Sequence, residues 1–234
     1  ASLRLQHLAD SAFPIGAAAH SFGLETLVAE GVLTAQSLHH LLRDFLWETG
    51  QAEAMFGRLA YHCALRHAVP GWLEQWFAIN SAIAAWKAPR ESREASATLG
   101  RRFLQTVAQL DATPCLCQAQ TAAQQARVDI HYCAAFGLVG GALQLGEDAT
   151  ILAYLQQSLM GLVSACLRLL PMGQGRATEI LWALKPLVVD VLAASQLDTP
   201  AVESTSELVP YLDRLTTFTP MLDLASMRHA TLPT

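Results

Sequence analysis

Charged side chains are scarce in this sequence. Asp, Glu, Lys and Arg make up 15% of its 234 residues, against about 25% in an average globular domain, while hydrophobic residues make up 52%. A chain with so little charge must hide much apolar surface inside its fold or against partners, so we expect an oligomer or a subunit of a complex. The net charge is −5 and no run of Lys or Arg forms a basic stripe, which argues against nucleic acid as a partner.

Signals for export and for disulfide bonding are also lacking. The N-terminus shows no basic region followed by an apolar stretch and a small-residue cleavage site. The five cysteines are odd in number and mostly lie in apolar helical pattern, which is typical of reduced thiols. We therefore expect a cytoplasmic protein.

One stretch is apolar enough to suggest a membrane span. Residues 149–167 carry no charge and have about the length of a bilayer-spanning helix. Gln156, Gln157 and Ser158 lie at its centre, where lipid would leave their polar groups unpaired. The stretch is therefore predicted to be a central core or interface helix, and no membrane partner is expected.

The motifs that most enzymes need are missing as well. No Ser or Cys nucleophile comes with a recognisable base and orienting acid, and there is no H-E-x-x-H. Gly137, Gly140 and Gly141 lie inside a helical pattern, where close helix packing explains them better than phosphate binding. The chain is therefore not expected to be an enzyme.

Helical periodicity is what the sequence has in abundance. Apolar residues recur at three- and four-residue steps, and no sustained two-residue alternation occurs. Residues 38–63 predict one long amphipathic helix that ends before Pro70-Gly71. Further helices are expected at about 71–87, 92–110, 116–126, 129–146, 149–170, 174–196 and 205–215, and a surface loop at 196–207. The fold class predicted is all-α, a single-domain helical bundle over residues 1–234 with central apolar helices.

The N-terminal segment combines turn chemistry with a helix start. Residues 8–25 read LADSAFPIGAAAHSFGLE. Pro14 restricts the backbone, and Gly16 and Gly23 allow conformations or close approaches that a side chain would block. Ser21 is predicted to cap the following helix, with Glu25 in its first turn.

This segment resembles the N-terminal signature of the UreF family of urease accessory proteins, and further blocks match in the same order. Residues 131–143 read HYCAAFGLVGGAL, and residues 159–174 read LMGLVSACLRLLPMGQ. The last block, residues 220–229, reads PMLDLASMRH. The blocks bracket nearly the whole chain, so the resemblance extends over most of it.

The resemblance implies a non-enzymatic cytoplasmic chaperone that forms a homodimer. UreF-like proteins bind the accessory protein UreD (UreH in some species) and recruit the GTPase UreG. That assembly acts on the urease apoprotein to install its nickel centre. No tightly bound cofactor is implied, although nickel could contact the chain transiently in the complex. Residues 1–20 would form a lead-in segment, and residues 216–234 a C-terminal partner-binding segment.

The resemblance also implies which residues serve partner contact or the integrity of the fold, two roles that the sequence alone does not separate. They are Asp10, Pro14, Gly16, His20, Ser21, Gly23, Glu25, His131, Gly137, Arg168, Gly173, Gln174, Met227, Arg228 and His229. Arg168 ends a long apolar helix and is either a dipole cap or an interface anchor. Gly173 and Gln174 form either a corner between helices or a binding turn.

Two other functions stay open. The first is a nickel-binding metallochaperone, for which Cys63 and His67, four apart on a predicted helix, and the pair Cys115 and Cys117 are weak ligand candidates. The second is a helical-bundle enzyme in which a buried histidine, His20 or His131, holds a cofactor.

Overall fold

The computed structural model describes residues 2–16 and 23–196, and every regular element in these ranges is helical. The prediction of an all-α fold is confirmed. The elements are α1 (Ser2–Leu8), α2 (Leu24–Ala29), α3 (Leu38–Phe45), a π-helical turn η2 (Leu46–Gly50), α4 (Gln51–Leu65), α5 (Trp72–Trp86), α6 (Arg90–Leu110), α7 (Pro114–Ala126), α8 (Tyr132–Ala142), α9 (Glu147–Leu169), α10 (Gln174–Ala183) and α11 (Lys185–Ala194).

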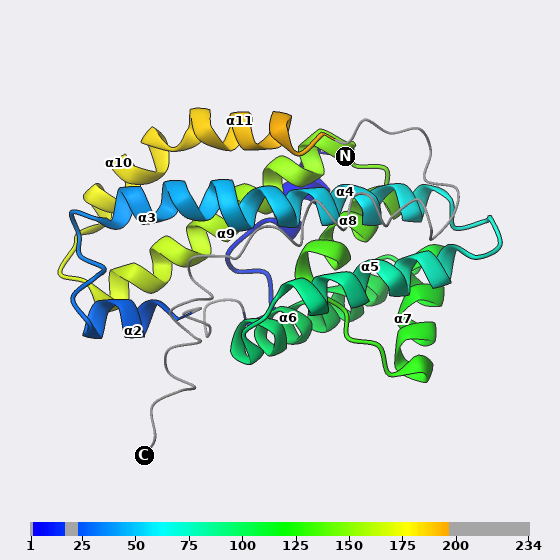
Figure 1. Ribbon diagram of the computed structural model, residues 1–234. Coiled ribbons are helices and arrows are strands. Elements are labelled where there is room, and N and C mark those ends of the chain that lie inside the picture. The colour runs from blue at the N-terminus through cyan, green and yellow to red at the C-terminus, as the bar shows by residue number, and fades with distance from the viewer. Residues whose placement is uncertain (1, 17–22, 197–234) are drawn as a thin grey trace, which may run out of the picture.

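Helix α8 lies at the centre of the molecule, where it contacts α4, α6, α7 and α9 (Figure 1). It approaches α4 so closely because glycines face the crossing. A Cβ atom built on Gly137 would lie 2.0 Å from the carbonyl oxygen of Gly57, and one on Gly141 would lie 2.4 Å from that of Tyr61. Since no side chain fits in these gaps, the predicted role of Gly137 in close helix packing is confirmed.

The predicted helix at 38–63 is nearly right in its bounds but not in its geometry. α3 and α4 form one continuous rod, visible in Figure 1, that is interrupted by the π-helical turn η2 at Leu46–Gly50. A π turn holds one more residue than an α turn, so it rotates the faces of α3 relative to those of α4. The rod ends at Leu65, and Gly71, with φ 88°, precedes α5.

Other predicted boundaries differ for identifiable reasons. The helix expected at 129–146 is shorter, because His131 lies at its N-cap and Gln144 and Gly146 have positive φ angles of 52° and 87°. The helix expected at 174–196 is divided at Leu184 into α10 and α11, since Pro186 has no N–H to continue the ladder. Gly23 lies at the N-cap of α2.

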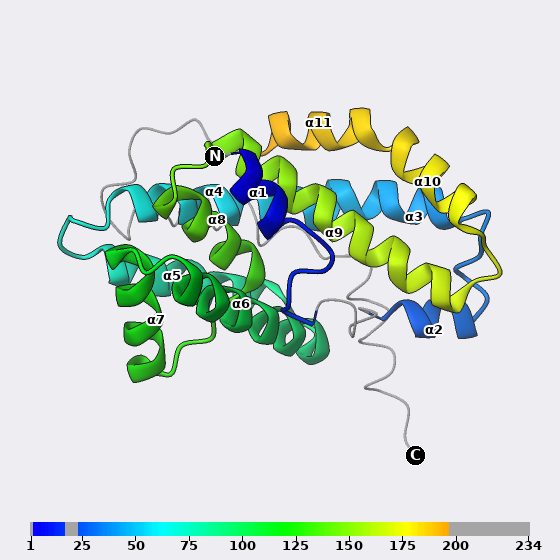
Figure 2. The same cartoon turned by 180° about the vertical axis from the view of Figure 1, so that it is seen from behind.

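Helix α9 contains residues 149–167, the stretch whose apolar sequence suggests a membrane span. Its length and apolar composition would allow it to cross a membrane, but 56% of its most apolar window is buried inside the protein. It packs against α2, α4, α8, α10 and α11, and α1 lies across it in the reverse view of Figure 2. This is the packing of a core helix, and Gln157 in its middle has a partner, as described below.

Several predictions fall outside the described residues. They concern His20, Ser21, Met227, Arg228 and His229, the helix at 205–215, the loop at 196–207 and the C-terminal segment at 216–234.

Candidate functional site

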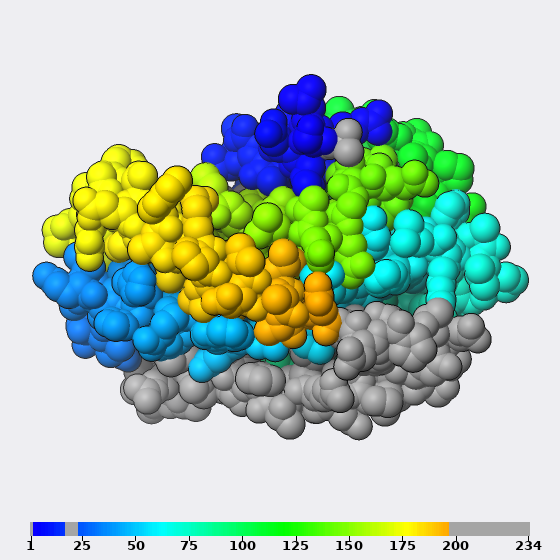
Figure 3. Space-filling view, turned by 90° about the horizontal axis from the view of Figure 1, so that it is seen from above, coloured from blue at the N-terminus to red at the C-terminus, as the bar shows by residue number. Residues whose placement is uncertain are grey.

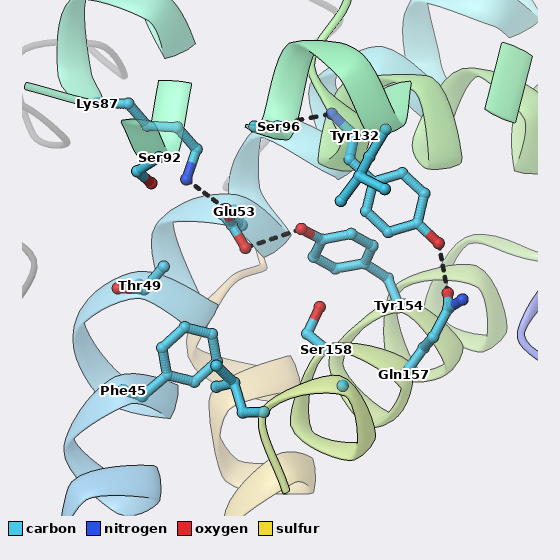
Figure 4. Close-up of a pocket in the computed structure, with 13 residues that line it drawn as sticks. Phe45, Thr49, Glu53, Lys87, Ser92, Ser96, Tyr132, Tyr154, Gln157 and Ser158 are labelled. Carbon is cyan, nitrogen blue, oxygen red and sulfur yellow. Dashed lines mark hydrogen bonds and ion pairs between the residues drawn. The ribbon is translucent and has the colours of Figure 1, made fainter. Parts of the chain in front are cut away.

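A pocket lined by both polar and apolar side chains lies where α3, η2 and α4 face α6, α8 and α9. Its volume is about 90 Å³, enough for a few water molecules or a very small ligand. It is lined by Phe45, Thr49, Glu53, Lys87, Ser92, Ser96, Leu99, Tyr132, Tyr154, Gln157, Ser158, Gly161 and Leu162. Figure 4 shows the polar groups of the long rod and of α9 converging on it.

A buried ion pair is the strongest interaction at the pocket. Lys87 Nζ lies 2.7 Å from Glu53 Oε1, and the Tyr154 hydroxyl donates a hydrogen bond of 2.7 Å to Glu53 Oε2 (Figure 4). Both charged side chains are almost fully buried. Burial, reinforced by the Glu53 charge, raises the pKa of Tyr154 well above its ordinary value, so the phenol remains a donor.

A second set of hydrogen bonds anchors the start of α8. The Tyr132 hydroxyl donates to Gln157 Oε1 at 2.5 Å, which satisfies the buried amide of α9. The backbone N–H of Tyr132 donates to Ser96 Oγ at 3.3 Å, and that of His131 donates to Asn80 Oδ1 at 2.8 Å. The first N–H groups of α8 are thus capped by side chains of α5 and α6, not by a residue of its own segment.

His131 is enclosed beside this cap. Its side chain is fully buried, and neither ring nitrogen has a hydrogen-bond partner. Burial, together with the positive charges of Lys87 and Arg93, lowers the pKa of His131 to about 3. The ring is therefore neutral at physiological pH, and it does not line the pocket.

The chemistry that these groups offer is limited. The pocket holds one carboxylate, Glu53, which is already neutralised by Lys87. Within residues 2–16 and 23–196 no group of three or more His, Cys, Asp and Glu side chains is arranged to hold a metal ion. A buried ion pair whose remaining oxygen is also hydrogen-bonded fits a structural polar network that joins α4, the C-terminal end of α5 and α9.

A second polar cluster, formed by Arg58, His62, Glu147, Asp148 and Ser195, was not foreseen from the sequence. The buried guanidinium of Arg58 contacts Glu147 and Asp148 at 2.7 Å each and Ser195 Oγ at 3.1 Å. It also donates to the Leu192 carbonyl oxygen at 3.2 Å. One side chain of α4 thereby fixes the start of α9 and the end of α11.

His62 completes this cluster from the next turn of α4. Its Nε2 lies 3.1 Å from Glu147 Oε2. Hydrogen bonding by His62 and then by Arg58 lowers the pKa of Glu147 to about 2, although partial burial opposes the shift. The sequence gives one indication of this cluster. Arg58 interrupts an otherwise apolar helical pattern, and two acids, Glu147 and Asp148, lie in the first turn of a later helix.

The N-terminal block forms an exposed turn in its described part. Asp10 Oδ1 accepts the N–H of Ala12 at 2.8 Å, while Phe13 and Ile15 are buried and anchor the turn. Asp10 and Pro14 are themselves exposed. Gly16 has φ 78°, and the space beside it is taken by Arg102, whose guanidinium donates to the Ile15 carbonyl at 3.4 Å.

The other described residues that the family resemblance implicates in partner contact or fold integrity lie on the surface. Glu25 is exposed in the first turn of α2. Arg168 is exposed in the last turn of α9 and donates to the Ser164 carbonyl at 3.3 Å, as a dipole cap would. Gly173 and Gln174 form an exposed corner that opens α10. The structure does not bring Arg168, Gly173 or Gln174 to the pocket.

The candidate metal ligands do not form a metal site within the described part of the chain. The buried Cys63 thiol contacts the Trp72 carbonyl oxygen at 3.2 Å, and burial raises its pKa to about 12. Burial likewise raises the pKa of Cys115 to about 12, while Cys117 is exposed. His67 Nδ1 contacts the Ala64 carbonyl at 3.0 Å. Thiols held in the protonated form are poor metal ligands.

Comparison with known proteins identifies relatives along the whole chain. A family profile described as UreF matches residues 32–185. The chain is 30% identical to the urease accessory protein UreF of Actinobacillus pleuropneumoniae, over 98% of this chain and 95% of that protein. It is 33% identical to the UreF of Methylorubrum populi, over 98% and 95%, and 29% identical to that of Trichormus variabilis, over 98% and 92%. These matches confirm the resemblance that the sequence blocks indicated.

Proposed function

Because the chain belongs to the UreF family of urease accessory proteins, we propose that it is a non-enzymatic scaffold for urease maturation. In this proposal it works in the cytoplasm as a homodimer, binds UreD (UreH), and recruits the GTPase UreG. The complex then supports nickel insertion into the urease apoprotein. The five cysteines are free thiols, four of them buried, which fits a reducing compartment.

The observation that carries the proposal is the division of the matching blocks between core and surface. The block at 131–143 is almost wholly buried, with Gly137 against α4, so it serves the fold. Two other parts of the matching blocks are exposed: the turn around Asp10 and Pro14, and the corner at Gly173 and Gln174. Both make few hydrogen bonds within the chain. Exposed elements of a family signature that do no packing work are suited to partner contact.

A scaffold also agrees with the chemistry of the described residues better than the two alternatives. A metallochaperone would need deprotonated thiolate or imidazole ligands in one place, whereas Cys63 and Cys115 are held protonated. A cofactor enzyme would need an accessible histidine. Of the two candidates, His131 is sealed from the pocket and His20 lies outside the described residues. In our proposal no cofactor is tightly bound, and nickel is cargo that contacts the chain at most transiently.

Capture of UreD and UreG tests the scaffold. The full chain, tagged and mixed with purified UreD and UreG, is expected to retain UreD, and UreG once UreD is present. Exchange of Asp10 or Gln174 for Lys should weaken retention at least about tenfold without loss of helicity, while the exposed control Gln124→Lys on α7 should not. Failure of the unaltered chain to retain UreD would contradict the proposal.

A cysteine variant distinguishes the scaffold from the metallochaperone. Cys63→Ala, Cys115→Ala and Cys117→Ser are combined in one chain, because small apolar residues suit the two buried sites. We expect urease activation in cells to remain within about twofold of the unaltered protein. Collapse of activation by a variant that still folds and binds UreD would favour direct metal binding.

A further inference from the structure

The pocket between the rod, α6 and α9 has short side chains on each of these walls. α9 contributes Ser158 and Gly161, α6 contributes Ser92 and Ser96, and the π-helical turn of the rod contributes Thr49 (Figure 4). Its volume of about 90 Å³ equals the space of about three water molecules in the liquid. A ligand that fits it therefore has about three to five non-hydrogen atoms.

The pocket lies on the side of α9 that faces away from the last two described helices. Seen from above in Figure 3, α10 and α11, coloured yellow to orange, form part of the outer surface. Figure 1 shows α6 on the opposite side of α9 from these two helices. No residue of α10 or α11 lines the pocket. A ligand in the pocket would therefore contact the rod, α6 and α9 inside the bundle.

Gly161 is a pocket residue that neither helix packing nor backbone geometry explains. It lies inside α9, where glycine is among the least favourable residues. Its φ angle is not positive, and a Cβ atom built on it would meet no described atom within 4 Å. At Gly57 and Gly137, by contrast, a Cβ atom would lie 2.8 Å and 2.0 Å from a neighbouring helix. Ser158 and Gly161 are half-buried, so the absent side chain leaves the pocket accessible along α9.

The charges at the pocket exclude an ionised ligand. Among the described residues that line it, the one carboxylate and the one ammonium, Glu53 and Lys87, are already paired at 2.7 Å. Burial raises the pKa of Tyr132 and of Tyr154, so both phenols are neutral at physiological pH. An anion or a cation placed beside them would lose its hydration without gaining a counter-ion. The ligand that fits is therefore uncharged.

The hydrogen-bonding groups of the lining indicate the class of ligand. Gln157 Oε1 accepts from Tyr132, whereas Gln157 Nε2 and the Ser92 hydroxyl make no hydrogen bond with any residue in the described part of the chain. Each oxygen of Glu53 accepts one bond, although an ionised carboxylate can accept about four in all. An apolar ligand would cover these groups without pairing them. A small carboxamide offers a carbonyl oxygen to Gln157 and N–H donors to Glu53 or Ser92.

We propose that this pocket is a binding site for a small uncharged amide of the acetamide and urea class, with Gln157 and Ser92 bonded to the amide group and Gly161 leaving room for it. A ligand of about four non-hydrogen atoms binds with a dissociation constant no lower than about 0.04 mM, so the site responds to amides at millimolar concentrations. This inference goes beyond the proposed function and does not depend on it.

Three probes of nearly equal size test the class of ligand. Acetamide, acetate and acetone differ from one another in charge and in N–H donors. Saturation-transfer difference NMR of the probe methyl groups follows their titration into the full chain. We expect acetamide to bind saturably with a dissociation constant of about 0.1–10 mM, and urea to displace it. Acetate and acetone should bind at least about tenfold more weakly. Acetamide that does not saturate, or acetate that binds equally well, would overturn the proposal.

Variants of the lining test the position of the site. Gly161→Leu places a side chain in the open space and should abolish saturable acetamide binding, while the melting temperature stays equal or rises. Ser92→Ala removes one hydroxyl and should weaken acetamide binding about threefold to tenfold. Gly175→Leu on α10, where a Cβ atom also meets nothing within 4 Å, is the control and should bind acetamide normally.

Two outcomes of these measurements would refute the site. The first is undiminished acetamide binding by a folded Gly161→Leu chain. The second combines loss of UreD capture in Gly161→Leu with no saturable acetamide binding by the unaltered chain, which would assign the space beside Gly161 to UreD. UreD capture by the unaltered chain is measured separately, so the scaffold and the amide site can fail independently.

Discussion

Lys87 determines the charge balance of the pocket. Its ammonium neutralises the one carboxylate there, Glu53, whose second oxygen is held by Tyr154. The attraction between the two charges offsets the cost of removing them from water only while both are present. Removing one partner is therefore strongly destabilising, whereas replacing both partners with neutral side chains changes the stability much less.

A double-mutant cycle should reveal this asymmetry. Lys87→Met alone leaves a buried, uncompensated carboxylate, and we expect it to lower the free energy of unfolding by about 3–5 kcal/mol. Lys87→Met combined with Glu53→Gln should recover at least half of that loss, because the neutral amide still accepts the Tyr154 hydroxyl. Urea denaturation of the four proteins measures the coupling. Strictly additive losses would contradict a coupled pair.

His131 should make the protein sensitive to mild acid. Its pKa is about 3 in the folded state against about 6.5 in an unfolded chain, so between these values the unfolded state binds a proton that the folded state excludes. Stability therefore falls as pH decreases through this window, by about 2 kcal/mol between pH 7 and pH 5 from this residue alone. Above about pH 7 both states are neutral and the contribution disappears.

His131→Leu isolates this effect. Because neither ring nitrogen has a partner, the exchange breaks no hydrogen bond of the side chain, and stability at pH 7 should change by less than about 1 kcal/mol. At pH 5 the variant should be more stable than the unaltered protein by about 2 kcal/mol. Chemical denaturation at both pH values provides the comparison, and parallel pH profiles would exclude His131 as the acid-sensitive group.

At the scale of elements, α4 and α8 cross with their backbones in close contact. Gly57 lies against Gly137, and Tyr61 lies against Gly141 one turn further along both helices. The spacing of glycines in α8 predicted a close approach, since such residues are otherwise unfavourable in a helix. The sequence did not identify α4 as the partner, because Gly57 is a lone glycine in a regular apolar pattern.

Gly137→Ala should therefore lower the stability of the protein more than the addition of a single methyl group usually does. The added methyl group would lie 2.0 Å from a backbone oxygen, which no side-chain rotation can relieve, so the helices must separate. We expect a loss of at least about 3 kcal/mol, at the upper end of the range for overpacking. Gly175→Ala, where a Cβ atom meets nothing within 4 Å, is the matched control. Equal melting temperatures for the two variants would contradict the close contact.

At the scale of the whole molecule, Arg58 joins parts of the chain that are distant in sequence. From α4 it reaches the start of α9 and the end of α11, after which the chain continues toward residues 216–234, the predicted partner-binding segment. Surface ion pairs contribute little, but this guanidinium is buried and its hydrogen bonds are charge-assisted. Arg58 is therefore expected to help hold α11 in place, beside the packing of α11 against α9 and η2.

Arg58→Met should loosen α11 more than the rest of the protein. Glu147 and Asp148 are partly exposed and can be rehydrated, so we expect a global loss of only about 1–3 kcal/mol. Hydrogen exchange of the α11 amides should accelerate at least about tenfold, while that of α8 changes less. Arg176→Met, which breaks an exposed pair with Glu179, is the control. Unchanged protection of α11 would show that its packing alone holds it.

The sequence predicted local features well and long-range ones poorly. Helix periods and the stop at Pro70-Gly71 follow from local geometry, and α5 begins directly after Gly71. The polar pocket and the Arg58 cluster could not be predicted, because Glu53 and Lys87 are 34 residues apart and Arg58 and Glu147 are 89 apart. Each of these residues resembles an ordinary surface charge until the fold brings its partner to it.

The way α8 is capped has a consequence for the order of folding. Its first N–H groups depend on Asn80 and Ser96, which lie 51 and 36 residues away from their respective donors, and its three glycines weaken it as an isolated helix. The central helix α8 is therefore not expected to form the folding nucleus. It is expected to become ordered only after α5 and α6 have formed, which gives φ-values near zero within α8 and higher ones in α6. The buried helix α8 would then become ordered late in folding. The folding rate is expected to be low, because segments distant in sequence must come together before α8 is stable.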